Sequence, residues 1–504
     1  MSDFKTNATS QSLESKKTSY TKIIKSASGL QIPEKKNIAF HSKYNPIKEA
    51  QTFSAQFDNE KSFYIIGGLC GAYHVWEVLK KNAGNKAIII ENSENDIQFL
   101  SEIESVQRLL KNTNAIITTP EDLYEKIINN FLPALYGNAR ILFLRSWENQ
   151  FSKTAQKTKI IIKRAINDVL NDFSTQRCFG KIWQRNIFQN LSFAKYSDTN
   201  AFFKIAAKKT NTNRAKTAAV VAAGPSLDKS ISTLKKEREK YFVISADTAF
   251  PVLLKNEIDS DIVISIDGQM ISHSHFINEI PKKTLFAFDL CACNSSVRKI
   301  KQKNAHFIFF ESGHPLAVFA SNFRDKTFFT HLCTGGGTVT CAAFSLARVL
   351  GFEKIEFFGA DFSYSNGKSY AKGTYFDELY FSCANRIVSA ETLFSGLFFR
   401  SKLRKIAENI YDTPLLATYK KSLEDLKTFK PRTSFRLSSP AQFPSTELKS
   451  RLIAMLKNQR IDFHDDPRNL FILIPQASFF QKQASREESF NLALTKTLLY
   501  TDWL

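Results

Sequence analysis

Short, fully apolar runs alternate with amphipathic segments in two stretches of the chain, and this alternation limits the possible fold more than any other feature. In the first stretch it predicts strands over 62–66, 87–90, 115–118 and 140–144. In the second it predicts strands over 218–223, 242–246, 262–266, 285–288, 307–310 and 354–358. Such alternation is typical of parallel sheets covered by helices. The sequence therefore predicts an α/β fold with two Rossmann-like parallel-sheet domains.

The segments outside these stretches complete the expected organisation. Residues 1–38 are polar and have no clear period, which favours disorder. After the second alternating stretch the pattern is helical, with helices expected over 446–458 and 486–499. In chain order we expect a disordered segment over 1–38, an N-terminal Rossmann-like domain over 39–146, a helical connector over 147–214, a central α/β domain over 215–402, and a helical C-terminal region over 403–504.

The amino-acid composition limits which kinds of ligand and partner the protein is expected to bind. The 69 Lys and Arg residues exceed the 48 Asp and Glu residues, and the net charge of +21 suits anionic ligands. These basic residues are spread along the chain, and no nucleic-acid-binding signature accompanies them, so no nucleic-acid partner is expected. The chain lacks a continuous apolar run of about 20 residues and begins with a polar segment, so we expect no membrane span and a cytoplasmic location. The seven cysteines include no CxxC pair, which argues against a zinc or disulfide framework.

The turn Gly224-Pro225-Ser226 is the first candidate for a binding site. It joins the first strand of the central domain to the following helix, and ligands of open parallel sheets bind beyond the carboxyl ends of the strands. Small residues there allow a phosphate to approach the N–H groups at the start of the helix. A tight turn in which Ser226 caps the helix explains the same residues, so both interpretations stay open.

Asp247 and Asp267 follow the next two predicted strands. Each carboxylate could bind a ribose or a base, or the pair could hold a divalent ion such as Mg²⁺. The alternative is that each aspartate caps the helix that follows it.

Two further segments end at the same predicted sheet edge. Gly336, Gly337 and Thr338 precede an apolar helix and predict a second helix N-terminus open to an anion, although no Walker A motif is present. The last strand, 354–358, leads into Asp361 and a polar loop that is rich in Tyr and Lys. A loop of this kind directly after a core strand is typical of a binding loop. Its candidates for holding an anionic leaving group are Tyr364, Lys368 and Tyr370.

These motifs, in this order, resemble known glycosyltransferases. "GPSL", the glycine-rich helix start and "LGFEKIEFFGADFSYSNGKSYA" resemble bacterial sialyltransferases, which use a CMP-activated nonulosonic acid. The spacing of the GPS turn, Asp247 and Asp267 is similar to that of the motility-associated factor (Maf) family, which modifies Ser and Thr of flagellin with such acids. "HSKYNPIKEA" and "IIGGLCGAYHVWEVL" resemble the Maf N-terminal signature, so the resemblance covers roughly residues 40–400.

The resemblance implies a function and roles for the candidate residues. Gly224, Pro225, Ser226, Gly336, Gly337 and Thr338 would surround a cytidine nucleotide, with Asp361 and Lys368 beside it, and Tyr364 and Tyr370 would stabilise the departing phosphate. The expected reaction is transfer of a nonulosonic acid from CMP to Ser or Thr hydroxyls of flagellin, in support of motility. The implied partners are a CMP-sugar donor and flagellin, with no obligatory cofactor.

Two departures from the sialyltransferases leave parts of this expectation open. Their asparagines at the second and third strand ends are Asp247 and Asp267 here, so Mg²⁺ could bridge this pair and a ligand. Their catalytic histidine follows the tyrosine loop, whereas here no histidine occurs between His331 and His464. Asp267, Asp247 and His331 are therefore the candidates for the general base.

Two other functions stay open. The central domain also resembles archaeal 6-hydroxymethylpterin diphosphokinases, which use ATP and magnesium and would make Asp247 and Asp267 metal ligands. The chain could instead be a non-catalytic flagellin-binding factor. In the first domain, the "GGLCGAYH" turn with Glu91 at the next strand end predicts either a scaffold or a second ligand site.

Overall fold

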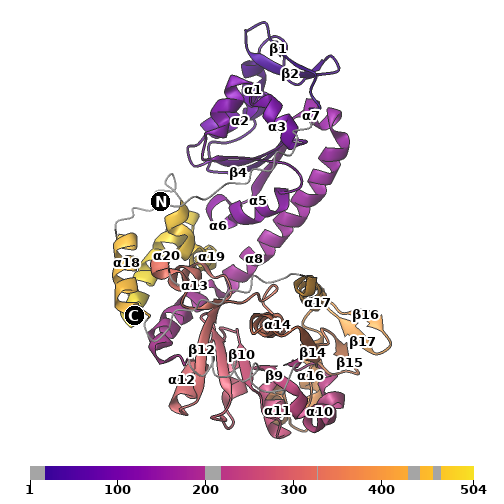
Figure 1. Cartoon of the computed structure of the whole chain (residues 1–504), viewed down its shortest axis with the longest axis vertical. Coiled ribbons are helices and arrows are strands. Elements are labelled where there is room, and N and C mark those ends of the chain that lie inside the picture. Colours follow the sequence, from indigo (N-terminus) through magenta and orange to yellow (C-terminus); the bar gives the residue numbers. More distant parts are fainter. Residues whose placement is uncertain (1–17, 199–216, 326, 429–442, 458–466) are drawn as a thin grey trace, which may run out of the picture. The chain divides into compact units, whose positions relative to one another are not determined.

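The structure is a computed structural model that describes residues 18–198, 217–325, 327–428, 443–457 and 467–504. The chain forms two compact units, which divide between Thr175 and Gln176. This point lies inside the 42-residue helix α8 (Ser152–Phe193), so one continuous helix runs from the first unit into the second (Figure 1). The helical connector predicted over 147–214 is thus mainly this helix, and its last part, residues 199–214, lies outside the described residues.

The first unit contains a four-stranded parallel sheet of order β6-β5-β4-β7, as the alternation predicts. Every residue of β4 is buried, because helices cover both faces of a parallel sheet. The strands are β4 (Phe63–Gly67), β5 (Lys86–Ile90), β6 (Ala115–Thr118) and β7 (Ala139–Phe143). The helices are α1 (Pro46–Ser54), α2 (Tyr73–Lys80), α3 (Glu94–Leu100), α4 (Glu104–Leu110), α5 (Leu123–Asn130), α6 (Pro133–Tyr136) and α7 (Arg145–Gln150).

A small antiparallel sheet stands where the sequence predicts disorder. It consists of β1 (Lys22–Lys25), β2 (Gln31–Lys35) and β3 (Ile38–Ala39), in that order. Tyr20, just before β1, is 4% exposed, and its ring packs 4.8 Å from that of Phe40. The prediction of disorder is wrong for this stretch because a few apolar side chains anchor short strands that are otherwise polar. Residues 1–17 lie outside the described residues.

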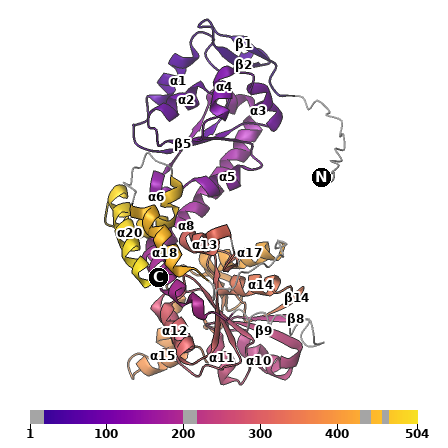
Figure 2. The same cartoon turned by 60° about the vertical axis from the view of Figure 1, so that its left-hand side comes forward.

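The second unit contains a seven-stranded parallel sheet within the described residues, of order β13-β12-β11-β10-β9-β8-β14. Its strands β9, β8 and β14 are labelled in Figure 2. The strands are β8 (Thr217–Val221), β9 (Tyr241–Ala246), β10 (Ile262–Ser265), β11 (Leu285–Asp289), β12 (His306–Glu311), β13 (Thr330–His331) and β14 (Lys354–Phe358). The chain runs outward from β8 to β13 and then returns to pair β14 with the other edge of β8. The carboxyl end of β8 is therefore the topological switch point, where open α/β sheets bind their ligands.

Helices and one small sheet complete the second unit. The helices are α10 (Leu227–Lys236), α11 (Phe250–Lys255), α12 (Asn294–Gln302), α13 (Pro315–Ser321), α14 (Val339–Val349), α15 (Tyr375–Cys383), α16 (Ala390–Phe398), α17 (Pro414–Thr428), α18 (Ser445–Lys457), α19 (Ile474–Phe480) and α20 (Arg486–Tyr500). Strand β17 (Ile410–Asp412) pairs on one side with β15 (Tyr364–Ser365) from the tyrosine loop and on the other with β16 (Arg404–Ala407). The region after residue 403 therefore begins as an antiparallel sheet, and its helices start only at Pro414.

The C-terminal part of α8 is fixed to the sheet of the second unit by buried asparagines. Asn186 donates from Nδ2 to the carbonyls of Gly268 and Cys291, at 2.9 and 3.0 Å. Asn190 donates to the carbonyls of Leu290 and Ala292, both at 2.9 Å. Each amide meets carbonyls that follow the strand ends, so α8 fixes the loops after β10 and β11.

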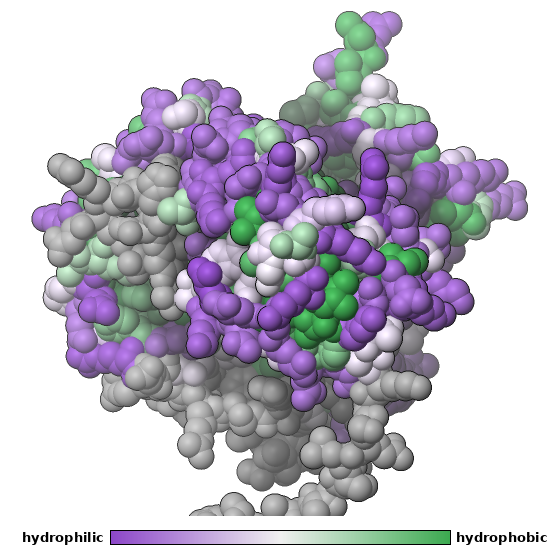
Figure 3. All heavy atoms as spheres, turned by 90° about the horizontal axis from the view of Figure 1, so that it is seen from above, coloured by the Kyte–Doolittle hydropathy of each residue, from purple (hydrophilic) through white to green (hydrophobic). Residues whose placement is uncertain are grey.

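The molecular surface is mainly hydrophilic on the face that Figure 3 draws, with hydrophobic side chains in small separate areas. Among the helices of the described residues, none is both long and apolar enough to cross a bilayer.

Candidate active site

A cavity of about 270 Å³ lies at the switch point of the large sheet, where the sequence places the candidate residues. Its walls come from the ends of β8, β9 and β14, the start of α14, the tyrosine loop and α17. The lining is rich in hydroxyls and contains one charged side chain, that of Asp361. The residues that line it are Ala222, Ala223, Gly224, Ala246, Thr248, Gly337, Thr338, Val339, Thr340, Gly359, Ala360, Asp361, Phe362, Ser363, Tyr364, Ser369, Tyr370, Leu416 and Tyr419.

The GPS turn is held by the turn that follows β14. Gly224 donates its N–H to the carbonyl of Gly359 at 2.8 Å. Asp361 accepts the N–H of Ser226 at 2.7 Å and also its hydroxyl. Ser226 occupies the N-cap position of α10, but its side chain makes no capping bond there and donates to Asp361 instead. Gly224 lines the cavity, whereas Pro225 and Ser226 do not.

The glycine run before α14 takes a backbone conformation that favours glycine. Gly335, Gly336 and Gly337 have φ angles of +53°, +82° and +99°, which side chains rarely adopt. Thr338 follows as the N-cap residue and makes no side-chain capping bond. The first N–H groups of an α-helix have no partner inside the helix, and the dipole there favours an anion. Gly337 and Thr338 line the cavity; Gly336 does not.

The tyrosine loop closes another side of the cavity. Tyr364 packs against Phe398 with ring centres 4.8 Å apart, and Tyr370 stacks on Phe376 at 4.7 Å. Burial raises the pKa of Tyr370 to about 12, so this phenol keeps its proton at neutral pH and can donate it in a hydrogen bond. The hydroxyl of Ser369 also lines the cavity, is buried and has no partner among the described residues. A buried hydroxyl without a partner is unfavourable unless water or a ligand meets it.

Lys368 lies outside this lining. Its ammonium pairs with Asp228 in the first turn of α10 at 3.2 Å. Asp228 also accepts the N–H of Lys372 at 2.8 Å. The observed role of Lys368 is thus to fasten the tyrosine loop to α10.

Asp247 and Asp267 lie behind the cavity wall. Asp247 is 2% exposed and accepts from the N–H and hydroxyl of Thr248, at 2.7 and 3.1 Å, and from the Ser265 hydroxyl at 2.6 Å. Asp267 accepts the N–H of Gln269 at 2.9 Å. Its pKa is raised, first by burial and then by the neighbouring Asp247 carboxylate. The two acids therefore interact, although neither lines the cavity.

The described residues contain no group of three or more His, Cys, Asp or Glu side chains arranged to hold a metal ion. The carboxylate oxygens of Asp247 already accept hydrogen bonds from the protein, which leaves Asp267 as the more available oxygen ligand. Magnesium binding at this pair stays a prediction.

The candidate base His331 lies far from the cavity. It ends β13, five strands away from β8, and five strand spacings are about 24 Å. Its Nδ1 pairs with the buried Glu311 carboxylate at 2.8 Å, and this hydrogen bond raises the pKa of His331. The strand order thus separates His331 from Gly224 and Tyr370.

Sequence reasoning missed Tyr419, which lines the cavity, and Arg400, which acts electrostatically on the tyrosines of this region. Tyr419 belongs to α17, about 50 residues beyond the tyrosine loop. Burial raises the pKa of Tyr364, Tyr370, Tyr375 and Tyr380, and the Arg400 guanidinium opposes this rise in all four. Arg400 is exposed and follows α16, so it is a cation within electrostatic reach of the tyrosine loop. No local motif marks either residue.

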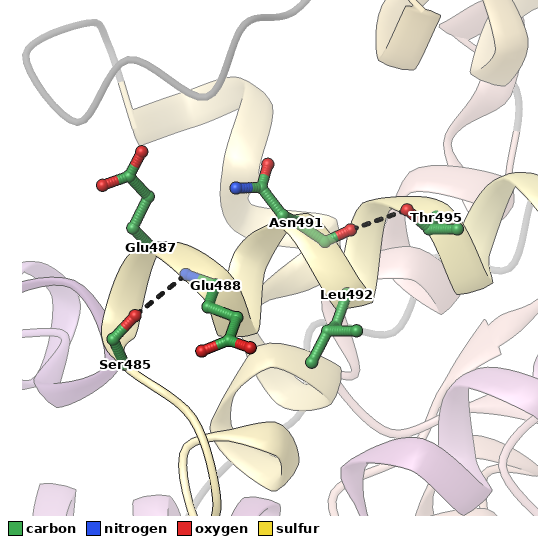
Figure 4. A pocket seen from close by; sticks show the side chains of 6 residues that line it. All are labelled: Ser485, Glu487, Glu488, Asn491, Leu492 and Thr495. Carbon is green, nitrogen blue, oxygen red and sulfur yellow. Dashed lines mark hydrogen bonds between the residues drawn. The ribbon is translucent and has the colours of Figure 1, made fainter.

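A second hollow lies on the surface of α20, and it lacks the converging strand ends that form the switch-point cavity. Its lining comes from one helix and the residue before it, and Ser485 accepts the N–H of Glu488 as an N-cap (Figure 4). Glu487 and Glu488 would repel an anionic ligand. The switch-point cavity is therefore the better candidate.

The glycine-rich turn of the first unit is filled by the protein itself. Glu91 is fully buried, and one carboxylate oxygen accepts the N–H of Leu69 at 3.2 Å and the Tyr20 hydroxyl at 3.1 Å. The other accepts the Trp147 indole N–H at 2.7 Å. In a nucleotide site, such N–H groups and such a carboxylate would face the ligand. Here they bond to each other, which favours the scaffold interpretation.

Comparison with solved structures gives the fold class. The chain matches the structure of the MAf glycosyltransferase from Magnetospirillum magneticum AMB-1 with a TM-score of 0.52 and 12% identity, over 97% of this chain and 87% of that one. The expected resemblance to Maf is thereby confirmed at the level of the fold. Residues 185–367, which contain β8 to β14, match the family model described as "6-hydroxymethylpterin diphosphokinase MptE-like". The chain is therefore an α/β protein with the Maf fold and an MptE-like central region.

Comparison with the sequences of other proteins shows the family to which the chain belongs. Two uncharacterized proteins of Treponema pallidum (strain Nichols) are similar to the chain. One is 31% identical over 185 residues, which are 37% of this chain and 81% of that protein. The other is 37% identical over 155 residues, which are 30% of this chain and 54% of that protein, so the chain spans about half its length. The chain belongs to the same family as the first of these two Treponema proteins.

Proposed function

We propose that the chain is a glycosyltransferase that moves a nonulosonic acid from a CMP donor to Ser or Thr hydroxyls of a flagellin-type protein. The observation that carries the proposal is the hydroxyl-rich cavity at the switch point, which joins the GPS turn, the start of α14 and the tyrosine loop. The fold that the chain shares with a MAf glycosyltransferase supports the same reaction class.

The geometry suggests how CMP would be held. The N–H groups at the start of α14 would bind the phosphate, aided by the helix dipole. The hydroxyls of Thr338, Ser369 and Tyr370 would donate to the oxygen on which negative charge develops as CMP leaves. Donors that are already in place stabilise such charge without reorganisation. Arg400 would add a positive charge at the mouth of the tyrosine loop.

A second candidate function is favoured by the MptE-like match. A diphosphokinase of that type would use ATP and Mg²⁺ at Asp247 and Asp267. The hydrogen bonds that Asp247 accepts from Thr248 and Ser265 compete with a role as a metal ligand.

Thermal unfolding with candidate nucleotides separates these functions. A ligand that binds only the folded chain at 100 times its dissociation constant stabilises it by about 2.7 kcal/mol. We expect CMP to raise the Tm, and ATP with Mg²⁺ to leave it unchanged. The reverse result would favour the diphosphokinase, and no response to either would favour a non-catalytic role.

The acceptor is tested by intact-mass spectrometry of flagellin from cells with and without the protein. We expect the mass to fall by whole nonulosonic acid residues when the protein is removed. An unchanged mass would exclude flagellin as the acceptor.

A further inference from the structure

The GPS turn has no N–H group left for a phosphate. Gly224 donates its N–H to the carbonyl of Gly359 at 2.8 Å, and the proline that follows has none. Ser226 donates its N–H to Oδ2 of Asp361 at 2.7 Å. Leu227, the first residue of α10, donates to the carbonyl of Gly224 at 3.0 Å. The Asp361 carboxylate therefore occupies the place at the start of α10 where a bound anion would otherwise lie.

The start of α14 is open, in contrast to the start of α10. Val339 and Thr340 are the first two residues of α14, and both line the cavity. Their N–H groups have no acceptor in the part of the chain that the structure describes. The Ser369 side chain lines the same cavity, is 6% exposed, and has a hydroxyl that is also unpaired there. Because folding normally pairs buried polar groups, three unpaired donors around one cavity favour this side as the phosphate site.

Asp361 provides the charge of the cavity, because no other residue of its lining carries one. Ser226 donates to both carboxylate oxygens, from its N–H to Oδ2 and from its hydroxyl to Oδ1. A carboxylate oxygen has two acceptor positions, so each oxygen keeps one that no described residue fills. A phosphate next to this carboxylate would be repelled. The carboxylate instead suits a neutral group with hydroxyl donors, and the ribose of a nucleotide carries two such hydroxyls on adjacent carbons.

We propose that Asp361 binds the ribose hydroxyls of the donor and selects a ribonucleotide over a 2′-deoxyribonucleotide; this rests on the glycosyltransferase function proposed above. The 2′- and 3′-hydroxyls donate to the two carboxylate oxygens, while the phosphate binds the N–H groups at the start of α14 and the Ser369 hydroxyl. Ser226 fixes the carboxylate in position, so the GPS turn acts through Asp361 and not as a phosphate site. The nucleotide thereby lies in the cavity in one orientation.

The test is calorimetric titration of the full-length protein with CMP and with 2′-deoxy-CMP. Because hydrogen bonds to charged groups are the stronger ones, the wild-type protein should bind CMP about tenfold more tightly than 2′-deoxy-CMP. In Asp361→Asn and Asp361→Ala this preference should fall to about threefold or less. Asp228→Asn is the matched control, because Asp228 lies in the first turn of α10 and pairs with Lys368 but does not line the cavity. Its preference for CMP should remain that of the wild-type protein.

Cytidine provides an independent readout, because it has the ribose but no phosphate. Asp361→Asn should weaken the binding of cytidine and of CMP by the same factor. Ser369→Ala should weaken the binding of CMP by about tenfold and leave that of cytidine unchanged. If the carboxylate lay beside the phosphate, Asp361→Asn would remove a repulsion and bind CMP more tightly than the wild-type protein does, and this result would overturn the proposal.

The outcomes separate the two proposals. If the wild-type protein does not bind CMP, both fail. If it prefers CMP to 2′-deoxy-CMP but transfers no sugar from a CMP-nonulosonate to flagellin, the glycosyltransferase function fails and the ribose assignment stands. If it binds the two nucleotides equally, or if a folded Asp361 variant keeps the wild-type preference, the assignment of Asp361 is wrong. If Asp361→Ala does not fold, Asp361→Asn, which has nearly the same shape as the wild-type residue, decides, and an equal loss of preference in Asp228→Asn would also overturn the assignment.

Discussion

Replacing Gly224 by alanine is a stringent test of the switch-point site. A Cβ atom added at Gly224 would lie 2.5 Å from the carbonyl oxygen of Gly359 and 2.7 Å from Oδ2 of Asp361. Real Cβ contacts essentially never fall below 3.0 Å, so one turn must move by at least 0.5 Å (3.0 − 2.5). The obstacle at Gly359 is backbone, which cannot rotate away as a flexible side chain would.

This movement acts on both stability and ligand binding. It stretches the bond from the Gly224 N–H to the Gly359 carbonyl, now 2.8 Å, and displaces the carboxylate that holds Ser226. Overpacking of this kind costs about 2 kcal/mol, which corresponds to a fall in Tm of about 3 °C for a unit of this size. Because Gly224 and Asp361 line the cavity, CMP affinity should fall by about tenfold, equivalent to about 1.4 kcal/mol.

Differential scanning calorimetry and CMP titration measure these effects, and Gly396→Ala is the matched control. The same methyl group at Gly396, inside α16, meets nothing within 4 Å. Alanine also favours a helix over glycine by about 1 kcal/mol, so this variant should keep or slightly raise the Tm and keep CMP affinity. If Gly224→Ala retained both the Tm and the CMP affinity of the wild-type protein, the close contact between the two turns would be refuted as a determinant of the site.

Three further outcomes follow from the contacts described above. In initial-rate assays, Arg400→Ala should raise KM for the CMP donor by about tenfold, which equals a loss of about 1.4 kcal/mol in donor binding. Arg400→Lys keeps the positive charge and should recover part of this loss. An unchanged KM would exclude Arg400 from donor binding. Asn190→Ala leaves the buried carbonyls of Leu290 and Ala292 unpaired and should lower the unfolding free energy by about 2 kcal/mol in urea titrations, whereas no change would show that these bonds do not anchor α8. Burial raises the pKa of Glu91 to about 7, so the folded protein keeps a proton that the unfolded chain releases near pH 4.5. The first unit should therefore lose stability as the pH rises from 4.5 to 7, seen as falling protection factors of the β4 and β5 amides relative to their intrinsic exchange rates at each pH, and Glu91→Gln should remove this slope.

Much of the fold can be predicted from the sequence because parallel strands leave a strong local signal. Strands β6 and β14 match their predicted bounds, and the other predicted strands agree with the structure to within two residues at each end. Strands that are buried on both faces appear in the sequence as short apolar runs, and the adjoining helices have one apolar face. The strands over residues 22–39 were missed because their exposed positions are polar, so the short apolar anchors did not form a run.

The candidate site was only partly predictable. Gly224, Gly337, Thr338, Asp361, Tyr364 and Tyr370 line one cavity, as the rule for strand ends suggests. The partner of Ser226 is Asp361, 135 residues away, and no local pattern reveals that bond. Arg400 and Tyr419 come from two separate segments, and no local motif marks either of them.

The sequence by itself determined which residues stand at the carboxyl ends of the strands, because that depends on local apolar runs and the turns that end them. Only the tertiary structure decided which of these ends are neighbours. The order β13-β12-β11-β10-β9-β8-β14 arises from hydrogen bonds between strands up to 137 residues apart (Thr217 and Lys354). That order places the GPS turn beside the tyrosine loop and separates His331 from both, because each intervening strand adds about 4.8 Å.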